Sequence, residues 1–386
     1  MMSRGIVTYA GYLPRHRLQR SELAAAHGGR GTGARVVASH DEDSTTLAVE
    51  AARKLIGSAA EPPGSIHFAT TSPPYLDKAN ATAIHAALDL GHEGFAVDMA
   101  GSARSAIGAL RAAASGGGLA VMADVRTGLP ASADEREGAD GGAAFLFGPA
   151  DQSAVEILAE ASVTVEFLDR WRIPSEPASR QWEERFGLET YLPLAREVAG
   201  RVLEEAGIEQ PDTVVVSSPH ARAAAALGKE FAAESLELGY AGAADVGLRL
   251  AAALDGAQPG ETILLLSAAD GADAALLRTT DRIADARRGA PIAAQLAGGR
   301  DVAYPRYLSW RGLLDTEPPR RPEPDRPAGP PSARAEAWKF AFVGSACDAC
   351  GQVHVPPRRV CAGCGAVDQM TRRPLADQAG TVATYT

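Results

Sequence analysis

Two stretches of this chain carry the same order of apolar and polar segments. Each begins with a short apolar run that ends in Ser-Pro, continues with an alanine-rich segment, and closes with a second apolar run after a turn that contains glycine. Short apolar runs bounded by turn residues predict buried strands, whereas the longer alanine-rich segments predict helices. The predicted elements are the strands 66–73 and 119–123 with the helix 106–114 in the first stretch, and the strands 213–220 and 262–266 with the helix 246–254 in the second.

Strands that alternate with helices in this way indicate βαβ units and parallel pairing. Because the set occurs twice, we expect an α/β fold of two similar halves, packed closely through their alanine-rich helices about a pseudo-twofold axis. The expected parts of the chain are an N-terminal half over 1–165, a C-terminal half over 166–314, a linker over 315–336, a zinc ribbon over 337–372 and the start of a strand over 373–386.

The segment 315–334 is rich in proline, arginine and glutamate. Proline fixes φ and lacks a backbone N–H, so this composition predicts a linker that forms neither a helix nor a central strand. Further on, 380–386 alternates like an opening β-strand. Since a lone strand is not stable by itself, we expect it either to pair with the ribbon or to begin a further β domain.

The chain has four cysteines, and all of them lie in one short segment as two Cys-x-x-Cys pairs, Cys347 with Cys350 and Cys361 with Cys364. Four thiolates in this arrangement are the ligand set of a structural Zn²⁺ in a zinc ribbon. Redox chemistry would use a single pair, and disulfides would imply an oxidising compartment. The residues before Cys347 contain no thiol, so the large domain cannot use a cysteine nucleophile.

The formal net charge is −10, which argues against non-specific nucleic-acid binding. No apolar run approaches the roughly 20 residues of a membrane span, and the first residues lead straight into an apolar strand without the core of a signal peptide. We therefore expect a cytoplasmic protein that neither spans a membrane nor binds nucleic acid.

Several segments of the large domain carry family-like patterns. They are 5–15, Thr71-Ser72-Pro73-Pro74-Tyr75 with Lys78, 123–130 with 141–145, Phe167-x-x-x-Trp171-Arg172 and Trp310-Arg311-Gly312. Together they resemble hydroxymethylglutaryl-CoA synthase of the archaeal and bacterial type, a member of the thiolase superfamily. This resemblance implies duplicated βαβαβ halves in five α-β-α-β-α layers and coenzyme A or acyl-CoA as the ligand. The tail resembles the rubredoxin-like zinc ribbon that precedes the acyl-CoA-associated OB-fold of the DUF35 family, and this resemblance implies that the last strand is the start of an incomplete OB-fold.

The catalytic positions that this family implies are occupied by other residue types. The general acid/base Glu falls on Thr71, the acyl-enzyme Cys falls on Ala103, and the His that orients the acceptor falls on Ser217. Threonine has no proton that titrates near neutral pH, and alanine has no atom to acylate. The resemblance therefore implies a protein without covalent acyl transfer.

Four further residues are candidates at or beside the family's functional positions. In the related ketoacyl synthase III pattern the His falls on His220 and the Asn on Tyr240, while the Lys of the synthase falls on Arg222, which suits a CoA phosphate. Ser102, next to Ala103, is either a substitute nucleophile or the N-cap of a helix over 105–111. His220 and Tyr240 are either acid/base groups or ordinary packing residues.

These features leave three hypotheses for the function. The first is an acyl-CoA-binding, non-acylating subunit or scaffold, homodimeric through a central strand edge or in complex with a thiolase. The second is a thiol-independent aldolase or retro-aldolase on β-hydroxyacyl-CoA with His220, Tyr240 and Ser217 as candidate groups, since steroid side-chain aldolases pair a thiolase-like subunit with a DUF35 protein. The third is a docking role of the zinc ribbon.

Overall fold

The computed structural model describes residues 4–384 except 57–61, 175, 319 and 322–328. The chain forms two compact units. The larger unit comprises Met1–Ala81 with Gly94–Thr316, and the smaller comprises Thr82–Glu93 with Glu317–Thr386. Each is described by itself below.

One mixed sheet of nine strands runs through the larger unit, in the order β11-β12-β13-β8-β1-β7-β6-β4-β5. Pairing is parallel between β4 and its neighbours β5 and β6 and between β11 and β12, as expected for βαβ units, and antiparallel elsewhere. The strands are β1 (Arg4–Tyr12), β4 (Ser65–Thr70), β5 (Phe95–Ala100), β6 (Gly118–Asp124), β7 (Gly141–Pro149), β8 (Val155–Val163), β11 (Thr213–Ser217), β12 (Thr262–Ala268) and β13 (Ala272–Thr279).

The expected duplication is visible in this sheet. The strands β5, β4, β6, β7 and β1 form one half and β11, β12, β13 and β8 form the other, and each half ends its βαβ part in an antiparallel pair, β6–β7 or β12–β13. The second group of strands begins with β8, ahead of the boundary expected at 165, because β8 pairs with β13 along most of its length. The two halves meet where β1 pairs with β8 at Ile6 and Val155.

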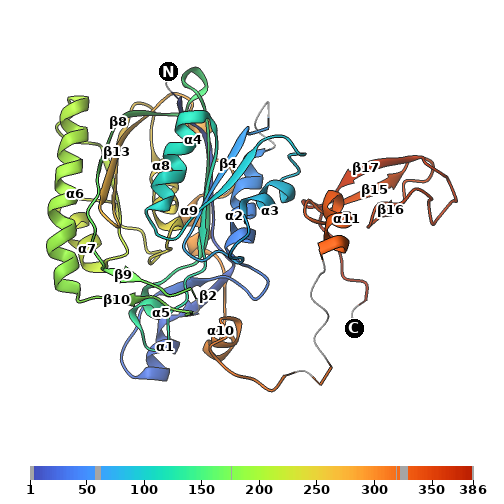
Figure 1. Cartoon of the computed structure of the whole chain (residues 1–386), viewed down its shortest axis with the longest axis horizontal. Coiled ribbons are helices and arrows are strands. Elements are labelled where there is room, and N and C mark those ends of the chain that lie inside the picture. Colours follow the sequence, from blue (N-terminus) through green and yellow to red (C-terminus); the bar gives the residue numbers. More distant parts are fainter. Residues whose placement is uncertain (1–3, 57–61, 175, 319, 322–328, 385–386) are drawn as a thin grey trace. The chain divides into compact units, whose positions relative to one another are not determined.

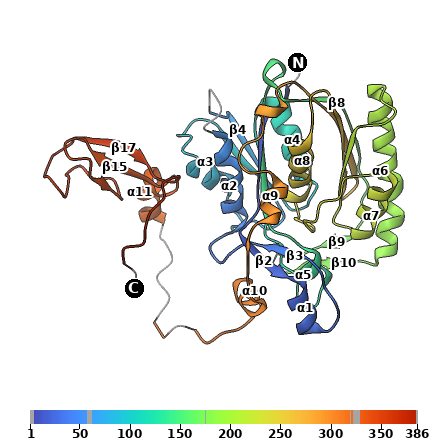
Figure 2. The same cartoon turned by 180° about the vertical axis from the view of Figure 1, so that it is seen from behind.

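Helices cover both faces of the halves and fill the space between them. Figure 1, and the view from behind in Figure 2, show α4 and α8 between the two halves of the sheet, with α6 and α7 outside one half and α2 outside the other. This is the five-layered arrangement expected from the sequence. The helices of the chain are α1 (Arg20–His27), α2 (Ser44–Ile56), α3 (Ala81–Ala87), α4 (Ser105–Gly116), α5 (Ala133–Glu137), α6 (Glu184–Ala206), α7 (Ala221–Glu230), α8 (Ala244–Gly256), α9 (Ile292–Ala297), α10 (Tyr304–Trp310) and α11 (Gly329–Lys339).

Small residues allow the central helices to approach the sheet closely. A Cβ added at Gly247 in α8 would lie 2.3 Å from the Met122 sulfur of β6 and 3.0 Å from the Ala143 Cβ of β7. Any side chain at position 247 would push the helix away from the first half of the sheet. The alanine-rich composition of the two central helices thus has the packing role expected from the sequence.

Short strands and helices complete the larger unit. The strands β2 (His16–Gln19), β3 (Ala34–Val37) and β14 (Arg300–Asp301) form a three-stranded sheet, and β9 (Arg170–Trp171) pairs with β10 (Arg180–Gln181). The buried guanidinium of Arg35 lies 5.2 Å from the ring centre of Tyr307 in α10 and 3.5 Å from the carboxylate of Asp140. These contacts hold α10 on the body of the unit.

The smaller unit contains a three-stranded antiparallel sheet of β15 (Val343–Cys347), β16 (Val353–His354) and β17 (Met370–Pro374). The helix α11 overlaps the segment 315–334, so the expectation that this whole segment is non-helical was wrong. Its prolines Pro330 and Pro331 occupy the first turn, where a missing N–H costs no hydrogen bond. Residues 380–384 form no strand, and 385–386, the end of the expected strand, lie outside the described residues.

Candidate functional site

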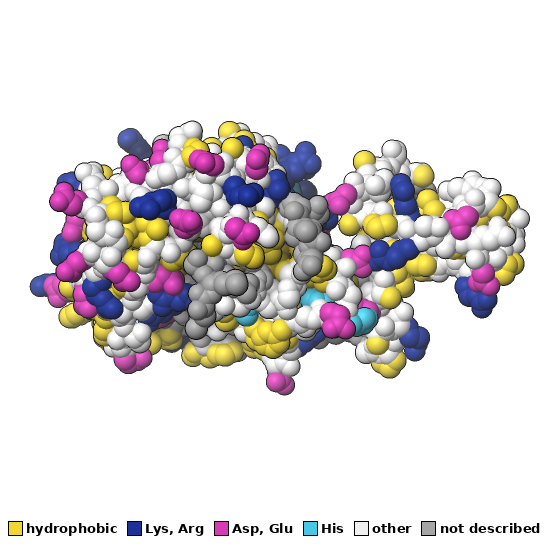
Figure 3. Space-filling view, turned by 90° about the horizontal axis from the view of Figure 1, so that it is seen from above, with side chains coloured by type: hydrophobic (Ala, Val, Ile, Leu, Met, Phe, Trp, Pro, Cys, Tyr) yellow, Lys and Arg dark blue, Asp and Glu magenta, His cyan; other side chains and the backbone are white. Residues whose placement is uncertain are grey.

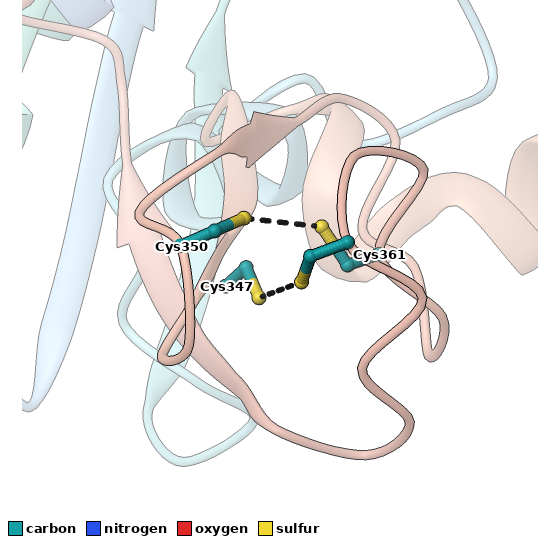
Figure 4. A group of neighbouring side chains, drawn as sticks. Cys347, Cys350 and Cys361 are labelled. Atoms are coloured by element: carbon teal, nitrogen blue, oxygen red, sulfur yellow. Dashed lines mark hydrogen bonds between the residues drawn. The ribbon is translucent and has the colours of Figure 1, made fainter.

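The four cysteines converge on one point in the smaller unit, as Figure 4 shows for Cys347, Cys350 and Cys361. All four sulfur atoms lie within 4.8 Å of one another, with 3.6 Å between Cys347 and Cys364 and 3.5 Å between Cys350 and Cys361. A tetrahedral Zn²⁺ with Zn–S bonds near 2.3 Å requires sulfur atoms about 3.8 Å apart. The four thiols therefore fit a structural zinc ion, and they leave no open coordination position for catalysis.

Hydrogen-bond donors surround the sulfur atom of Cys361. The Gly363 N–H donates to its sulfur at 3.4 Å, and His354 Nε2 lies 3.4 Å from the same atom. The backbone of Cys364, with His354 next in weight, lowers the pKa of the Cys361 thiol to about 5. Donors of this kind stabilise a thiolate and fix its direction toward a metal.

A cavity of about 100 Å³ lies in the larger unit, beyond the C-terminal ends of β4, β5 and β11. It brings together Thr71 after β4, the residues Gly101–Ala103 between β5 and α4, and Pro219 and Tyr240 from the second half. Four sequence-predicted positions, namely Thr71, Ser102, Ala103 and Tyr240, thus share one cavity. Its other lining residues are Arg126, Arg170, Trp171, Arg172, Ser179, Tyr191, Ala269 and Asp270.

Asp124, at the end of β6, holds Thr71 in the wall of this cavity. Its fully buried carboxylate accepts six hydrogen bonds, from the hydroxyls of Thr70, Thr71 and Ser72 and from the backbone N–H groups of Thr71, Ser72 and Ala243. The Thr71 hydroxyl donates its proton to Asp124 at 2.7 Å and accepts from Arg126 Nη1 at 3.2 Å. Thr71 therefore acts as a hydrogen-bond bridge and not as an acid/base group.

Arg104 fixes the loop that carries Ser102 and Ala103. Its guanidinium donates to the Asp273 carboxylate at 2.8 Å and to the Asp270 carbonyl at 2.7 Å, both in the second half. The Ser102 hydroxyl accepts the Arg104 backbone N–H at 3.2 Å, as a turn residue before α4 does. The side chain of Ala103 offers the cavity only a methyl group.

Ser217 and His220 are buried and lie outside the set of residues that line the cavity. The Ser217 hydroxyl donates to Asp245 at 2.8 Å, and the same carboxylate accepts from Arg249 at 2.8 Å. His220 caps α7, because its Nδ1 accepts the Ala223 N–H at 3.0 Å. In a neutral His220 ring the proton is therefore on Nε2. A Cβ added at Gly187 would lie 2.7 Å from this nitrogen and 2.8 Å from Asp169 Oδ1, so both atoms face Gly187.

Tyr240 lines the cavity and also a second cavity of about 560 Å³ bordered by α7 and α8. The Arg126 guanidinium carbon lies 5.6 Å from the centre of its ring. Burial raises the pKa of the Tyr240 phenol, and Arg126 only partly offsets this effect. The Tyr240 phenol is therefore protonated at neutral pH. Arg222 is exposed on α7 and does not line the cavity that contains Ala103.

Arg126, Arg170 and Tyr191 also line the cavity, although none of them was a candidate from the sequence. Arg126 lies after β6, Arg170 lies in β9, and Tyr191 on α6 contacts Asp169 and Asp270. The only local signal was the Arg170-Trp171-Arg172 run, of which Trp171 and Arg172 were noted as a family mark. Arg126 and Arg170 are far apart in the sequence and meet at Asp134, which no spacing rule predicts.

Both units resemble known proteins. Residues 340–368 match the family model described as ChsH2, rubredoxin-like zinc ribbon domain. The hydroxymethylglutaryl-CoA synthase of Archaeoglobus fulgidus is 34% identical over 342 residues, covering 80% of this chain and 98% of the relative. That of Methanocella arvoryzae is 31% identical over 351 residues, covering 82% and 100%.

Solved structures show the same fold at low identity. A hydroxymethylglutaryl-CoA synthase complexed with CoA gives a TM-score of 0.68 at 16% identity, covering 80% of this chain and 90% of that one. The 3-oxoacyl-(acyl carrier protein) synthase III of Pseudomonas aeruginosa gives 0.61 at 20% identity, covering 72% and 98%. Among the described residues, the helices include none with the length and apolar character to cross a membrane. By its sequence relatives and its thiolase-like fold, the chain belongs to the hydroxymethylglutaryl-CoA synthase family and carries a rubredoxin-like zinc ribbon as well.

Proposed function

We propose that this protein binds acyl-CoA without forming an acyl-enzyme, as a non-acylating subunit or scaffold that acts with a thiolase in making or breaking carbon–carbon bonds. One observation carries the proposal. Ala103, at the position to which the resemblance assigns the acyl-enzyme cysteine, lies in the wall of the cavity, and the larger unit has no cysteine. Zinc has a structural role in this proposal, and CoA esters are the ligands.

The neighbours of Ala103 offer no ready substitute for the cysteine. A serine nucleophile needs a base within hydrogen-bond reach to remove its proton. The described contacts of the Ser102 hydroxyl are with the backbone of its own loop and include no such base. This arrangement supports binding of a thioester without covalent transfer to Ser102.

Incubation with acetyl-CoA tests this proposal. Intact-mass analysis is expected to show the unmodified chain at every time point, with a cysteine-dependent synthase of the family acylated in parallel as the positive control. The Ala103→Cys variant is expected to gain an acetyl adduct but little synthase activity, because Thr71 does not supply the acid/base proton. A stable adduct that maps to Ser102 in the unmodified sequence would contradict the proposal.

A second candidate function is thiol-independent retro-aldol cleavage of a β-hydroxyacyl-CoA, and the tyrosines and arginines of the cavity favour it. A base takes the proton of the β-hydroxyl group, and the bond between the α and β carbons breaks. The β carbon leaves as the carbonyl of an aldehyde or ketone, and the electron pair of the broken bond forms the enolate of the shortened thioester. A proton donor then protonates the α carbon. Tyr240 suits this last step, and a guanidinium suits the enolate oxygen.

Turnover separates the two candidates. If cleavage occurs, Tyr240→Phe is expected to lower kcat by roughly two to four orders of magnitude while CoA binding persists. His220→Gln tests a second predicted group and is expected to act through stability, because His220 caps α7. CoA binding without cleavage, with and without a thiolase partner, would leave the scaffold role alone.

A further inference from the structure

Asp169 is a buried carboxylate beside the wall of the cavity that contains Ala103. The residue is 3% exposed, and its Oδ2 atom has no hydrogen-bond partner among the described residues. Its backbone N–H donates to the Phe167 carbonyl at 3.0 Å, and its carbonyl accepts the Trp182 N–H at 2.8 Å, so the loop around it is held in place. Burying a carboxylate oxygen without a partner costs free energy, and a group of this kind next to a cavity is a candidate for proton transfer.

Two buried rings meet at this carboxylate. Tyr191 on α6 lines the cavity, and its phenol is hydrogen-bonded to the carboxylate of Asp169 and to the backbone of Asp270. The ring of His220 lies 6.1 Å from that of Tyr191, measured between ring centres. Because Nδ1 of His220 caps α7, its Nε2 is the nitrogen on the side of Asp169. Of these three groups, Tyr191 is the one that reaches the cavity wall.

A glycine on α6 makes room for this arrangement. A Cβ added at Gly187 would lie 2.4 Å from Cδ2 of His220 and 2.8 Å from Oδ1 of Asp169. Gly200 on the same helix differs, since an added Cβ there would have no neighbour within 4 Å. Any side chain at position 187 would therefore push the imidazole and the carboxylate apart.

The surroundings of Asp169 make it a better proton acceptor than an ordinary carboxylate. Burial raises its pKa, the charge of Asp270 acts in the same direction, and His220 and Arg170 only partly offset this effect. Burial, and next the charge of Asp169, also raise the pKa of Tyr191, so the phenol is protonated at neutral pH. Tyr191 can thus accept a proton from the cavity only while it passes its own proton to Asp169.

We infer that Tyr191 takes the proton of the β-hydroxyl group in the retro-aldol cleavage proposed above, while Asp169 takes the proton of Tyr191. The O–H bond of the substrate breaks, and its electron pair forms the C=O bond of the leaving aldehyde or ketone. The pair of the broken Cα–Cβ bond forms the enolate, which Tyr240 protonates at the α carbon. The proton on Asp169 then returns through Tyr191 to water. This inference rests on the second candidate function and names its base.

Cleavage of 3-hydroxybutyryl-CoA tests the inference, because it releases acetaldehyde, which alcohol dehydrogenase and NADH report. Tyr191→Phe is expected to lower kcat by roughly 100- to 10,000-fold and to leave KM within about threefold, since only the phenol oxygen is lost. Asp169→Asn keeps the shape of the side chain but takes no proton, so kcat is expected to fall by roughly 10- to 1,000-fold. In the unmodified protein kcat is expected to rise with pH as Asp169 ionises, and Asp169→Asn is expected to lose this rise.

Matched variants control for the loss of a buried phenol and for changes in α6. Tyr9→Phe removes a phenol that donates to Asp255 at 3.1 Å outside the cavity lining, and it is expected to keep kcat. Gly200→Ala is also expected to keep kcat, whereas Gly187→Ala is expected to lower it by separating His220 from the carboxylate. Circular dichroism checks that each variant is folded.

The outcomes separate this inference from the function on which it rests. An unchanged kcat in folded Tyr191→Phe or Asp169→Asn would overturn the inference and leave the cleavage itself standing. Absence of acetaldehyde from the unmodified protein, with and without a thiolase, would overturn both the inference and the retro-aldol candidate.

Discussion

Asp124 of the first half accepts the backbone N–H of Ala243 in the second half at 2.6 Å. A Cβ at the preceding residue, Gly242, would lie 2.0 Å from the same carboxylate, and Gly242 has a φ of +61° that favours glycine. The loop that carries Tyr240 is thus bound directly to the strand end that supports Thr71. Together with the contacts of Arg104 to Asp270 and Asp273, this contact between the halves sets the geometry of the cavity.

Asp124→Asn is therefore expected to destabilise the larger unit by roughly 2–4 kcal/mol, because the new amide group directs a donor at one of the donors that now surround the carboxylate. Urea unfolding followed by circular dichroism measures the loss. Asp281→Asn, at an exposed position, serves as the control and is expected to change the free energy of unfolding by less than about 0.5 kcal/mol. Equal stability of the two variants would show that the carboxylate has no such role.

The second prediction concerns the metal centre. Protein purified without chelator is expected to contain about one Zn²⁺ per chain by elemental analysis, and Cys350→Ser is expected to lose it. His354→Gln is expected to keep the ion but to bind it roughly 10- to 100-fold more weakly, measured by competition with a chelator, because a hydrogen bond to Cys361 is changed. A folded sample with disulfides in place of metal would exclude the zinc centre.

Coenzyme A is expected to raise the melting temperature, and Arg222→Ala is expected to reduce this shift by weakening a phosphate contact. Loss of one charge-assisted contact costs about 1.5–3 kcal/mol of binding free energy, which calorimetry would detect as a weaker Kd. Arg201→Ala on α6, whose partner is Glu197, is the matched control. An unchanged Kd for CoA in Arg222→Ala would assign the phosphates to other residues.

Asp212 gives a prediction about pH. Its carboxylate accepts the N–H and hydroxyl of Thr262 at 2.8 and 2.7 Å, and these bonds lower its pKa in the folded protein. A carboxyl group with a lowered folded pKa stabilises the fold above its unfolded pKa and loses this effect as the pH falls through the folded pKa. The urea midpoint of Asp212→Asn is therefore expected to lie below that of the unmodified protein at pH 7, with the gap closing toward pH 3. A gap of the same size at both values would contradict this.

The sequence predicted the two halves well because their apolar runs and alanine-rich segments leave few alternatives. The helix 106–114 lies within α4, and the strand 262–266 lies within β12. The prediction for 315–334 was wrong in part, since proline prevents a helix only beyond its first turn. Four positions of the candidate site, Thr71, Ser102, Ala103 and Tyr240, could be placed from the family resemblance, and they share one cavity.

The remaining part of the site depends on contacts between distant segments. His220 follows Ser-Pro at a strand end and was a catalytic candidate for that reason, but the hydrogen bond from Ala223 makes it a helix cap. Arg126 and Arg170 come together because both reach Asp134. Neither relationship has a signature in spacing or composition, because each joins residues that only the fold brings together.

The groups that hold this cavity in shape are Asp124 and Arg104, and neither of them interacts through the side chain at position 103. An alanine at that position therefore costs the surrounding backbone none of its support. The framework of the cavity and the side chain at its wall are thus separable, so position 103 can change its residue type while the backbone around it keeps its geometry.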